Sequence, residues 1–403
     1  MTKAILVLNA GSSSIKFALY DVERVDVVCH GQIDGIGVAP RFTIQGEHKA
    51  ALPASPTLPR DSTHETLTAW LLGALRSRMS NVTIVAAGHR VVHGGPRFDT
   101  PVRIDEAVLC ELDSFVSLAP LHEPHNLATI RAVAKAWRGL PQVACFDTQF
   151  HRSQPRLAQL FALPRSLTEA GVLRYGFHGL SYEYIVSVLP EHVGAKADGR
   201  VIVAHLGNGA SMCAIKGRRS VASTMGFTAL DGLVMGTRCG AIDPGVVLHL
   251  LDHKGLSVPA VTDLLYNKSG LLGVSGLSGD VRELESSDDP HAAEALDLFA
   301  YRALRELGSL VAVLGGLDVL VFTAGIGEHS AGIRRRICEH ADWAGITIDL
   351  AANARQKTRI SKTGSAVDVV VIPTNEEIVI ARSALNLIAS GGSKAMMSAR
   401  SFH

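Results

Sequence analysis

The chain has 403 residues, of which 47% are hydrophobic and 19% charged, and its formal net charge is +1. This composition is typical of a globular protein, and the length predicts two domains instead of one core. A charge so close to balance gives no general attraction to polyanions and argues against a nucleic-acid-binding function.

The six cysteines form no CxxC motif and no paired spacing. This favours free thiols in a reducing compartment over a zinc site or a disulfide framework. Asn9 interrupts the short apolar run at the N-terminus before it reaches signal-peptide length. The longest apolar stretch, near residues 310–317, falls far below the roughly 20 residues needed for a membrane span. We therefore expect a cytoplasmic protein without a membrane partner.

Two segments half a chain apart share one pattern: an apolar run, a Gly-rich polar loop and a second apolar run. They are residues 5–19 (ILVLNAGSSSIKFAL) and residues 201–215 (VIVAHLGNGASMCAI). Each predicts a β-hairpin whose tip can approach a ligand closely. Backbone N–H groups in a tip of Gly, Ser and Asn suit a phosphate. Two such tips facing each other across a cleft indicate a duplicated nucleotide-handling enzyme.

Strands and helices follow one another in both halves. In the first half we expect strands and loops at 31–60, a helix at 63–79, a strand at 82–87, helices at 105–118 and 125–137, and a strand at 142–146. In the second half we expect an irregular loop at 225–245, helices near 244–253, 258–266 and 290–314, a strand at 318–323, a helix capped near Ser330, a strand at 369–372 and a closing helix from 374. This order indicates layered α/β domains. One would span 1–150 plus 384–403 and the other 151–383.

Some motifs of other enzyme classes are incomplete or absent. Gly325 and Gly327 follow a strand as in a dinucleotide fingerprint, but Ser330 stands in place of the third glycine. The segment is still compatible with a helix N-terminus that receives a nucleotide phosphate or sugar. The sequence has no GxxxxGK[ST] and no GxSxG, which argues against a P-loop enzyme and a serine hydrolase.

Four polar residues lie beside glycines or at strand ends, where sites form in α/β proteins. Arg90, at a strand end, is suited to bind an anion through two parallel hydrogen bonds. For Arg238, in GTRCG, a surface ion pair is an equally good interpretation. Asp147 ends a strand and His178 lies in GFHG, but each could also serve as a cap or a loop hydrogen-bonding residue.

Taken together, these segments resemble the acetokinase family, in the sugar kinase, Hsp70 and actin superfamily. The matching stretches, in family order from residue 6 to residue 377, are LVLNAGSSSIKF, GHRVVHGG, LAPLHEPHN, CFDTQFH, RYGFHGLS, VAHLGNGAS, MGFTALDGLVMGTR, GVSGLSGDVR, VFTAGIGEH and IPTNEE. The resemblance covers essentially the whole chain. It implies two duplicated ribonuclease H-like domains of the actin/Hsp70 type, an interdomain active-site cleft, and a homodimer.

The resemblance also implies an activity: reversible, ATP-dependent phosphorylation of acetate to acetyl phosphate, by direct in-line transfer with Mg²⁺ or Mn²⁺. By motif, Asn9 and Glu376 would hold the metal and Arg90 would bind the substrate carboxylate. Asp147, His178 and Arg238 would be catalytic. The residues that would bind ATP are Lys16, His205, Leu206, Gly207, Asn208, Gly209, Asp280, Val281, Arg282, Gly325, Ile326, Gly327, Glu328 and His329.

The chemistry of carboxylate phosphorylation accounts for these residue types. A carboxylic acid has a pKa of roughly 4, so the nucleophile is already ionised at neutral pH and needs no strong base. The difficulty is to bring an anion against a triphosphate, which cationic side chains and a metal ion overcome. We therefore expect Asp147 to orient an arginine or the substrate instead of accepting a proton.

A few residues depart from the family's usual pattern. Ala229 stands where a proline usually lies beside the acyl pocket, Glu123 and His125 vary the LHNPAN motif, and His329 replaces an asparagine. These changes leave the acyl specificity and the nucleotide preference open. One alternative is a propionate or butyrate kinase on the same scaffold. Another is a non-kinase ATPase module of the actin or Hsp70 type, which would have no use for Arg90 and Arg238.

Overall fold

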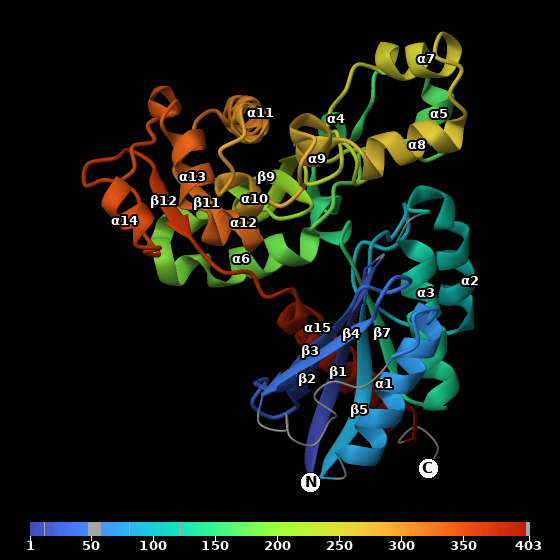
Figure 1. The fold of residues 1–403 in the computed structure, drawn as a ribbon. Coiled ribbons are helices and arrows are strands. Elements are labelled where there is room, and N and C mark those ends of the chain that lie inside the picture. Colours follow the sequence, from blue (N-terminus) through green and yellow to red (C-terminus); the bar gives the residue numbers. More distant parts are fainter. Residues whose placement is uncertain (12, 47–57, 80, 121, 400–403) are drawn as a thin grey trace. The chain divides into compact units, whose positions relative to one another are not determined.

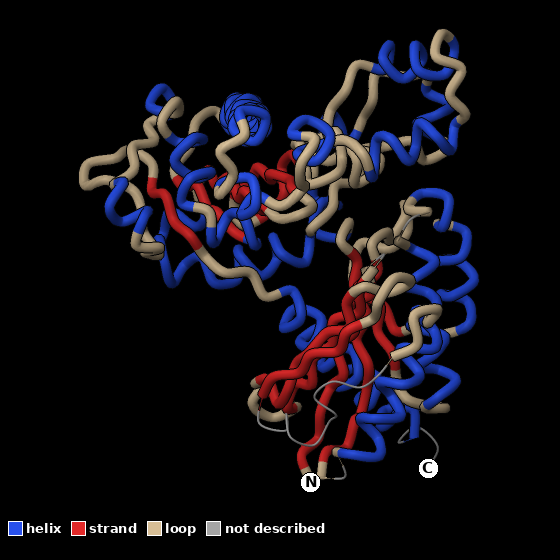
Figure 2. The backbone as a smooth tube through the Cα atoms, in the orientation of Figure 1, coloured by secondary structure: helices blue, strands red, loops and turns tan. Residues whose placement is uncertain are grey.

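The computed structural model describes residues 1–11, 13–46, 58–79, 81–120 and 122–399, with the side chains of the last helix described through Ala389. The predicted strands and loops that fall at 47–57 lie outside these residues. The chain separates into two compact units, Met1–Gln149 with Asn375–His403, and Phe150–Thr374. Each unit is built around its own mixed β-sheet, drawn in red in Figure 2.

The sheet of the first unit has the strand order β4-β3-β2-β1-β5-β7-β6. Its strands are β1 (Thr2–Ala10), β2 (Ser14–Asp21), β3 (Val27–Asp34), β4 (Arg41–Gly46), β5 (Val82–Val91), β6 (Val102–Arg103) and β7 (Gln142–Phe146). Strands β1 to β4 form an antiparallel meander, whereas β5 is parallel to β1 and β7 is parallel to β5. The central strand β1 is apolar almost throughout because helices cover both of its faces.

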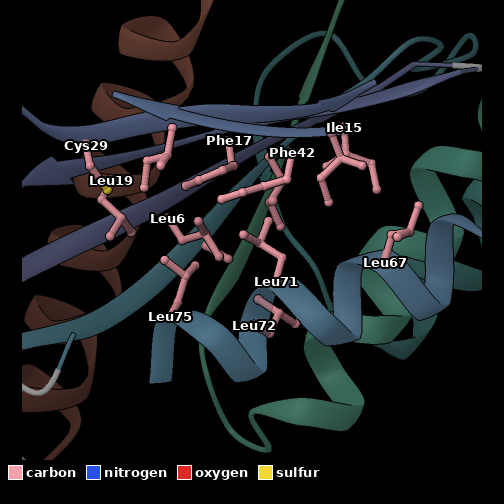
Figure 3. Close-up of a cluster of buried hydrophobic side chains, with 14 of the residues drawn as sticks. Leu6, Ile15, Phe17, Leu19, Cys29, Phe42, Leu67, Leu71, Leu72 and Leu75 are labelled. Carbon is pink, nitrogen blue, oxygen red and sulfur yellow. The ribbon is translucent and has the colours of Figure 1, made fainter. Parts of the chain in front are cut away.

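Helices α1 (His64–Arg78) and α3 (Glu123–Ala136) pack against each other on one face of this sheet, and α2 (Glu106–Ser114) lies beside α3 (Figure 1). Helix α15 (Glu376–Ala399) contacts β1, β5 and β7 on the other face, so the unit is discontinuous in sequence. Figure 3 shows how the leucines of α1 meet the side chains of the meander. This apolar layer fixes the strands whose ends carry the polar residues described below.

The second unit repeats the same plan with the strand order β10-β9-β8-β11-β12. The strands are β8 (Arg200–Leu206), β9 (Ala210–Lys216), β10 (Arg219–Ser223), β11 (Val319–Thr323) and β12 (Asp368–Val371). Strands β8 to β10 are antiparallel, and β11 and β12 continue parallel to β8. This is the order and sense of β3-β2-β1-β5-β7 in the first unit, so the predicted duplication of an α/β ribonuclease H-like fold is confirmed.

Helix α6 (Gly179–Val193) packs on one face of the second sheet and the long helix α11 (Pro290–Leu314) on the other (Figure 1). The remaining helices of this unit are α4 (Arg156–Gln159), α5 (Arg165–Glu169), α7 (Pro244–Asp252), α8 (Val258–Asn267), α9 (Gly270–Ser275), α10 (Val281–Glu285), α12 (Ala324–His329), α13 (Ala331–Cys338) and α14 (Leu350–Ala354). None of the helices in the described ranges combines the length and the apolar character needed to cross a bilayer.

Both predicted hairpins and the irregular loop at 225–245 are present, and Ser330 caps α13 by accepting a hydrogen bond from the Ile333 amide. Residues 324–329, which precede the predicted helix capped near Ser330, form a short helix of their own, α12. Ala324 begins this turn with a φ of 64°, a left-handed conformation that side chains other than glycine rarely adopt. Tertiary contacts described below hold this strained turn in place.

Candidate functional site

The first unit gathers a cluster of charged and amide side chains at the carboxyl ends of three neighbouring strands. We call Asn9, Arg90, Asp147 and Glu376 the arginine cluster. Arg90 donates two parallel hydrogen bonds to Asp147, from Nε to Oδ1 at 2.9 Å and from Nη2 to Oδ2 at 2.5 Å. Its Nη1 donates to Oδ1 of Asn9 at 3.1 Å. Glu376, at the start of α15, has Oε2 4.0 Å from Nε of Arg90.

The electrostatics of this cluster keep Arg90 charged and fixed. Burial alone would lower the pKa of Arg90, but the carboxylates of Asp147, Glu376 and Glu377 raise it on balance. The Asp147 side chain is 2% exposed, and a buried ion pair of this geometry leaves an uncompensated charge if one partner is removed. The arrangement agrees with an orienting role for Asp147, since both of its oxygens accept from the guanidinium.

Glu376 and Asn9 fit a hard divalent cation. Burial raises the pKa of Glu376 to about 7, against the effect of Arg90, and the nearby carboxylates of Asp147 and Glu377 raise it further. A cation would relieve this crowding of negative charge. Asn9 accepts from Arg90 through Oδ1, and an amide oxygen has a second lone pair for a metal or a water. No group of three His, Cys, Asp or Glu side chains arranged to hold a metal occurs in the described part of the chain, so water and phosphate oxygens would complete the coordination, as is usual for Mg²⁺.

The first turn of α3 ties together the strands that carry the arginine cluster. Asn126 accepts from the Val92 amide at 3.0 Å and donates to the Ala10 carbonyl at 2.7 Å. Glu123 accepts from the His93 amide through Oε2 at 3.3 Å, and its buried Oε1 has no hydrogen-bond partner among the described residues. Burial raises the pKa of Glu123 to about 8, the His93 amide opposes this, and Asp147 adds to it. From the sequence, Glu123 was noted only as a departure from the family motif.

We predict that Glu123→Gln stabilises the protein at alkaline pH. The Glu123 carboxyl stays protonated in the folded state up to a pKa of about 8, but ionises near its usual 4.5 when unfolded. At any pH between these two pKa values, unfolding releases a proton. The free energy of unfolding of the wild type therefore falls as the pH rises from 4.5 to about 8. Each pKa unit corresponds to about 1.4 kcal/mol, so the variant should gain a few kcal/mol relative to wild type between pH 5 and 8.

Urea unfolding midpoints at the two pH values measure this gain. The matched control is Glu106→Gln on α2, an exposed glutamate outside the cluster. A stability difference between Glu123→Gln and wild type that stays constant from pH 5 to 8 contradicts the prediction.

Lys16, expected to bind ATP, lies on β2 in the first unit. It lines a cavity of about 430 Å³ together with Tyr20, His30, Gln32, Asn375 and Glu377, among others. The wall of this cavity is held by a hydrogen bond of 3.2 Å from the Tyr20 hydroxyl to Asn375, which also accepts from the Ile378 amide at the start of α15. Lys16 thus belongs to a different pocket from the other residues expected to bind ATP, which all lie in the second unit.

In the second unit, the expected catalytic residues His178 and Arg238 approach each other at the tip of the β8–β9 hairpin. A Cβ atom added to Gly209 would lie 3.0 Å from Nη2 of Arg238 and 3.3 Å from Nε2 of His178. Any larger residue at position 209 would require these two side chains to shift by a few tenths of an ångström. Arg238 donates from Nη1 to the Ala229 carbonyl at 2.6 Å. His178 itself has a φ of 58°, a strained conformation of the kind that clusters at functional sites.

Most of the segments expected to bind the nucleotide meet in one cavity of the second unit, with a volume of about 600 Å³. Of the predicted residues, those lining it are Gly207, Asn208, Asp280, Val281, Arg282, Gly325, Ile326 and His329. Sequence reasoning missed Gly279, Glu285 and Ser330, which also line it. His205, Leu206, Gly209, Gly327 and Glu328 are not among the lining residues.

The loop that carries Arg238 is fastened to this pocket by its backbone. The Gly236 amide donates to the Asn208 carbonyl at 3.1 Å, and a Cβ on Gly236 would lie 2.2 Å from Oδ1 of Asn208. The Gly236 carbonyl accepts from the Leu272 amide of α9, and the Met235 carbonyl from Leu271. An irregular, Gly-rich segment is thereby held in one conformation beside the hairpin tip.

A fully buried arginine holds the α12 turn that forms one wall of the pocket. Arg334 donates from Nη1 to the carbonyls of Gly327 and Glu328, at 2.9 and 2.8 Å. Its other donors reach Asn353 and Gln356, and Gln356 in turn donates to the His329 carbonyl. Burial lowers the pKa of Arg334. These contacts explain why a Gly-rich segment that begins with a strained residue is helical.

Comparisons with known proteins identify the family of this chain. A sequence model described as the acetokinase family matches residues 4–382. The chain belongs to the acetokinase family. An acetate kinase from Rhodopseudomonas palustris is 54% identical over 399 residues, covering 97% of this chain and 100% of the relative. One from Nitrobacter hamburgensis is 50% identical over 402 residues, covering 98% of each.

Solved structures agree as well. A propionate kinase from Francisella tularensis has a TM-score of 0.88 and 37% identity, covering 94% of this chain and 98% of that one. An acetate kinase from Porphyromonas gingivalis has a TM-score of 0.84 and 35% identity, covering 96% and 100%. Membership of the acetokinase family makes the chain a phosphotransferase and implies ATP as a substrate together with a divalent metal ion.

Proposed function

We propose that this acetokinase catalyses the reversible, ATP-dependent phosphorylation of acetate to acetyl phosphate by direct in-line transfer. The observation that carries the proposal is Arg90, which the buried Asp147 holds in a fixed, fully charged orientation. Asp147 takes the Nε–Nη2 edge of the guanidinium and Asn9 takes one N–H of Nη1, so the substrate carboxylate would accept from the remaining N–H groups of Nη1 and Nη2. A family member that kept only ATP hydrolysis would have no need of an anion-binding arginine at this place.

Both units contribute to one reaction in this proposal. Acetate is bound as an anion by Arg90, and ATP occupies the pocket between the β8–β9 tip, α10 and α12. Arg238 and His178, which approach each other at Gly209, neutralise the oxygens of the phosphoryl group as it moves between two anions. Stabilising such charge with fixed donors is the main source of catalysis in phosphoryl transfer. Asp147 acts by orienting Arg90.

We further propose Mg²⁺, with Mn²⁺ as a substitute, bound by Glu376 directly and by Asn9 directly or through water. When bound, the ion supplies positive charge to the phosphate oxygens. Glu376 must ionise to bind it. Because the pKa of Glu376 is raised to about 7 by burial, metal affinity should fall as the pH drops below neutrality.

Trapping of acyl phosphate as a hydroxamate tests the proposal directly. Acetate-dependent hydroxamate formation with ATP supports it, and ATP hydrolysis without any acyl phosphate overturns it. A propionate kinase is the second candidate, since a solved relative at 37% identity carries that name and Ala229 replaces the family's proline. Values of kcat/KM for acetate, propionate and butyrate decide between them, because one methylene in an apolar pocket is worth about 1–3 kcal/mol.

We predict that Arg90→Ala and Arg238→Ala each lower kcat/KM by on the order of 100-fold or more, because each removes a donor that stabilises developing charge. Lysine at either position should restore activity only in part, since it lacks the planar fork. Arg97→Ala, an exposed arginine paired with Glu111, serves as the control. Near-normal kcat in an alanine variant, with an unchanged KM for the acid, contradicts the role of that arginine.

Glu376→Gln should raise the Mg²⁺ concentration that gives half-maximal rate, because the neutral amide loses the charge a hard cation requires. Titrations of activity against Mg²⁺ at fixed ATP measure this change. Glu339→Gln, an exposed glutamate on the second unit, is the matched control. Identical metal titrations for wild type and Glu376→Gln would remove Glu376 from the metal site.

We also propose a cytoplasmic homodimer. All six cysteines are free thiols, in keeping with a reducing compartment. Helix α7 is strongly apolar in sequence but has no buried residue. Val246 and Leu248 on α7 and Val258 on α8 are 42%, 65% and 67% exposed. Apolar side chains gathered in this way on adjacent helices are typical of an interface between subunits.

Replacing Leu248 with glutamate should shift the protein from dimer to monomer, because a charge placed in an apolar interface is costly to bury. Sedimentation velocity of wild type and Leu248→Glu across a concentration series measures the shift. Glutamate at Tyr301, which is 59% exposed on α11, is the control. A wild type that sediments as a monomer at all concentrations contradicts the homodimer.

A further inference from the structure

Two histidines at the hairpin tip are stacked, and each is tied to a serine. The rings of His178 and His205 lie 4.2 Å apart at an angle of 18°. Nδ1 of His178 is 2.9 Å from Oγ of Ser211, and Nδ1 of His205 is 2.8 Å from Oγ of Ser181. Ser211 also meets the Tyr182 hydroxyl at 2.5 Å. The chain Tyr182–Ser211–His178 therefore links a buried phenol to an imidazole.

The direction of the first hydrogen bond follows from burial. The Tyr182 side chain is fully buried on α6, and Ser211 is the one hydrogen-bond partner of its hydroxyl within the described residues. A buried O–H group that donates to nothing is strongly disfavoured. Tyr182 therefore donates to Oγ of Ser211. Burial also raises the pKa of Tyr182 well above its usual value, which keeps this proton in place.

The second hydrogen bond follows from the first. Ser211 has a single proton and, as part of β9, is itself fully buried. In the described structure its hydroxyl meets Tyr182 and His178 alone. Since it accepts from Tyr182, it donates its proton to Nδ1 of His178. A neutral imidazole that accepts at Nδ1 carries its proton on Nε2.

We propose that Tyr182 and Ser211 are positioning residues that lock His178 in the Nε2–H tautomer, so that Nε2 can donate a hydrogen bond to the phosphoryl group. The role of His178 in this inference rests on the proposed function. Nε2 of His178 and Nη2 of Arg238 approach one point beside Gly209, so both would present donors to the same anion. The opposite tautomer would present a lone pair to the phosphoryl oxygens and repel them.

The relay fits only one protonation pattern of the His178 ring. An imidazolium would need Nδ1 to donate, which would force Ser211 to turn its proton away from His178. The relay thus selects a neutral ring with one defined donor.

The test is the tautomer of His178 in ligand-free protein labelled with ¹⁵N-histidine, with the His178 signals assigned by their loss in His178→Gln. We expect Nδ1 to be unprotonated and Nε2 protonated in wild type. In Tyr182→Phe, Ser211 no longer has to accept from the phenol and can accept from Nδ1–H, so the Nδ1 signal should move toward the protonated position. Tyr184→Phe, on the same helix but outside the relay, should leave the signals unchanged.

Kinetics give a second readout. Tyr182→Phe should lower kcat about tenfold, the effect of about 1.4 kcal/mol in the transition state, with KM for ATP and for the acid little changed. A protonated Nδ1 in wild type, or His178 signals unaffected by Tyr182→Phe, overturns the inference. If Tyr182→Phe does not fold, Ser211→Ala replaces it with the same expected change. The tautomer is measured without substrates, so its outcome is independent of whether acetyl phosphate is formed.

Discussion

The ion pair between Arg90 and Asp147 sets the most demanding constraint on the first unit. A buried guanidinium must meet its carboxylate in good geometry, because otherwise the free energy lost on desolvating the two charges exceeds the gain from their attraction. That geometry depends on strand register: Leu8 of β1 pairs with His89 of β5, and Arg90 of β5 pairs with Cys145 of β7. Asn9, Arg90 and Asp147 then meet at one edge. A slip of one residue would turn Arg90 to the opposite face of the sheet, so the apolar packing that fixes register also fixes the site.

The second unit has the same strand order, but different groups lie at the ends of its strands. In the first unit Arg90 is the second-last residue of β5 and Asp147 directly follows β7, whereas the corresponding β11 of the second unit leads straight into the α12 turn. The turn begins with a left-handed Ala324, its residues Gly325, Ile326 and His329 line the pocket, and Arg334 takes up the carbonyls of Gly327 and Glu328. The first unit therefore has a charged cluster at its strand ends, and the second has a Gly-rich turn that lines a pocket.

What could be predicted from the sequence was local. The β1–β2 and β8–β9 hairpins follow from apolar runs around a Gly-rich tip, and α1 from its helical periodicity, with Thr63 and Thr66 forming a capping box at its start. Arg90, Arg238 and His178 could be named because they lie beside glycines in family motifs. Their partners could not all be found in this way. The orienting role of Asp147 was expected. The contact of Glu123 with the His93 amide was not, because it joins two segments of the chain that share no local sequence pattern.

The helical α12 turn and the Tyr182–Ser211 relay show why such contacts escape sequence reasoning. The two glycines of AGIGEH weaken its helix signal, and Arg334 and Gln356, from later in the chain, hold the turn by donating to the carbonyls of Gly327, Glu328 and His329. Tyr182 lies in the core of the second unit and would pass for a packing residue. Only the fold shows that its hydroxyl is one hydrogen bond away from the serine that holds His178. In a reaction that needs no strong base, chemistry depends on which atoms donate hydrogen bonds, and a buried phenol with a single acceptor sets that direction without any charge.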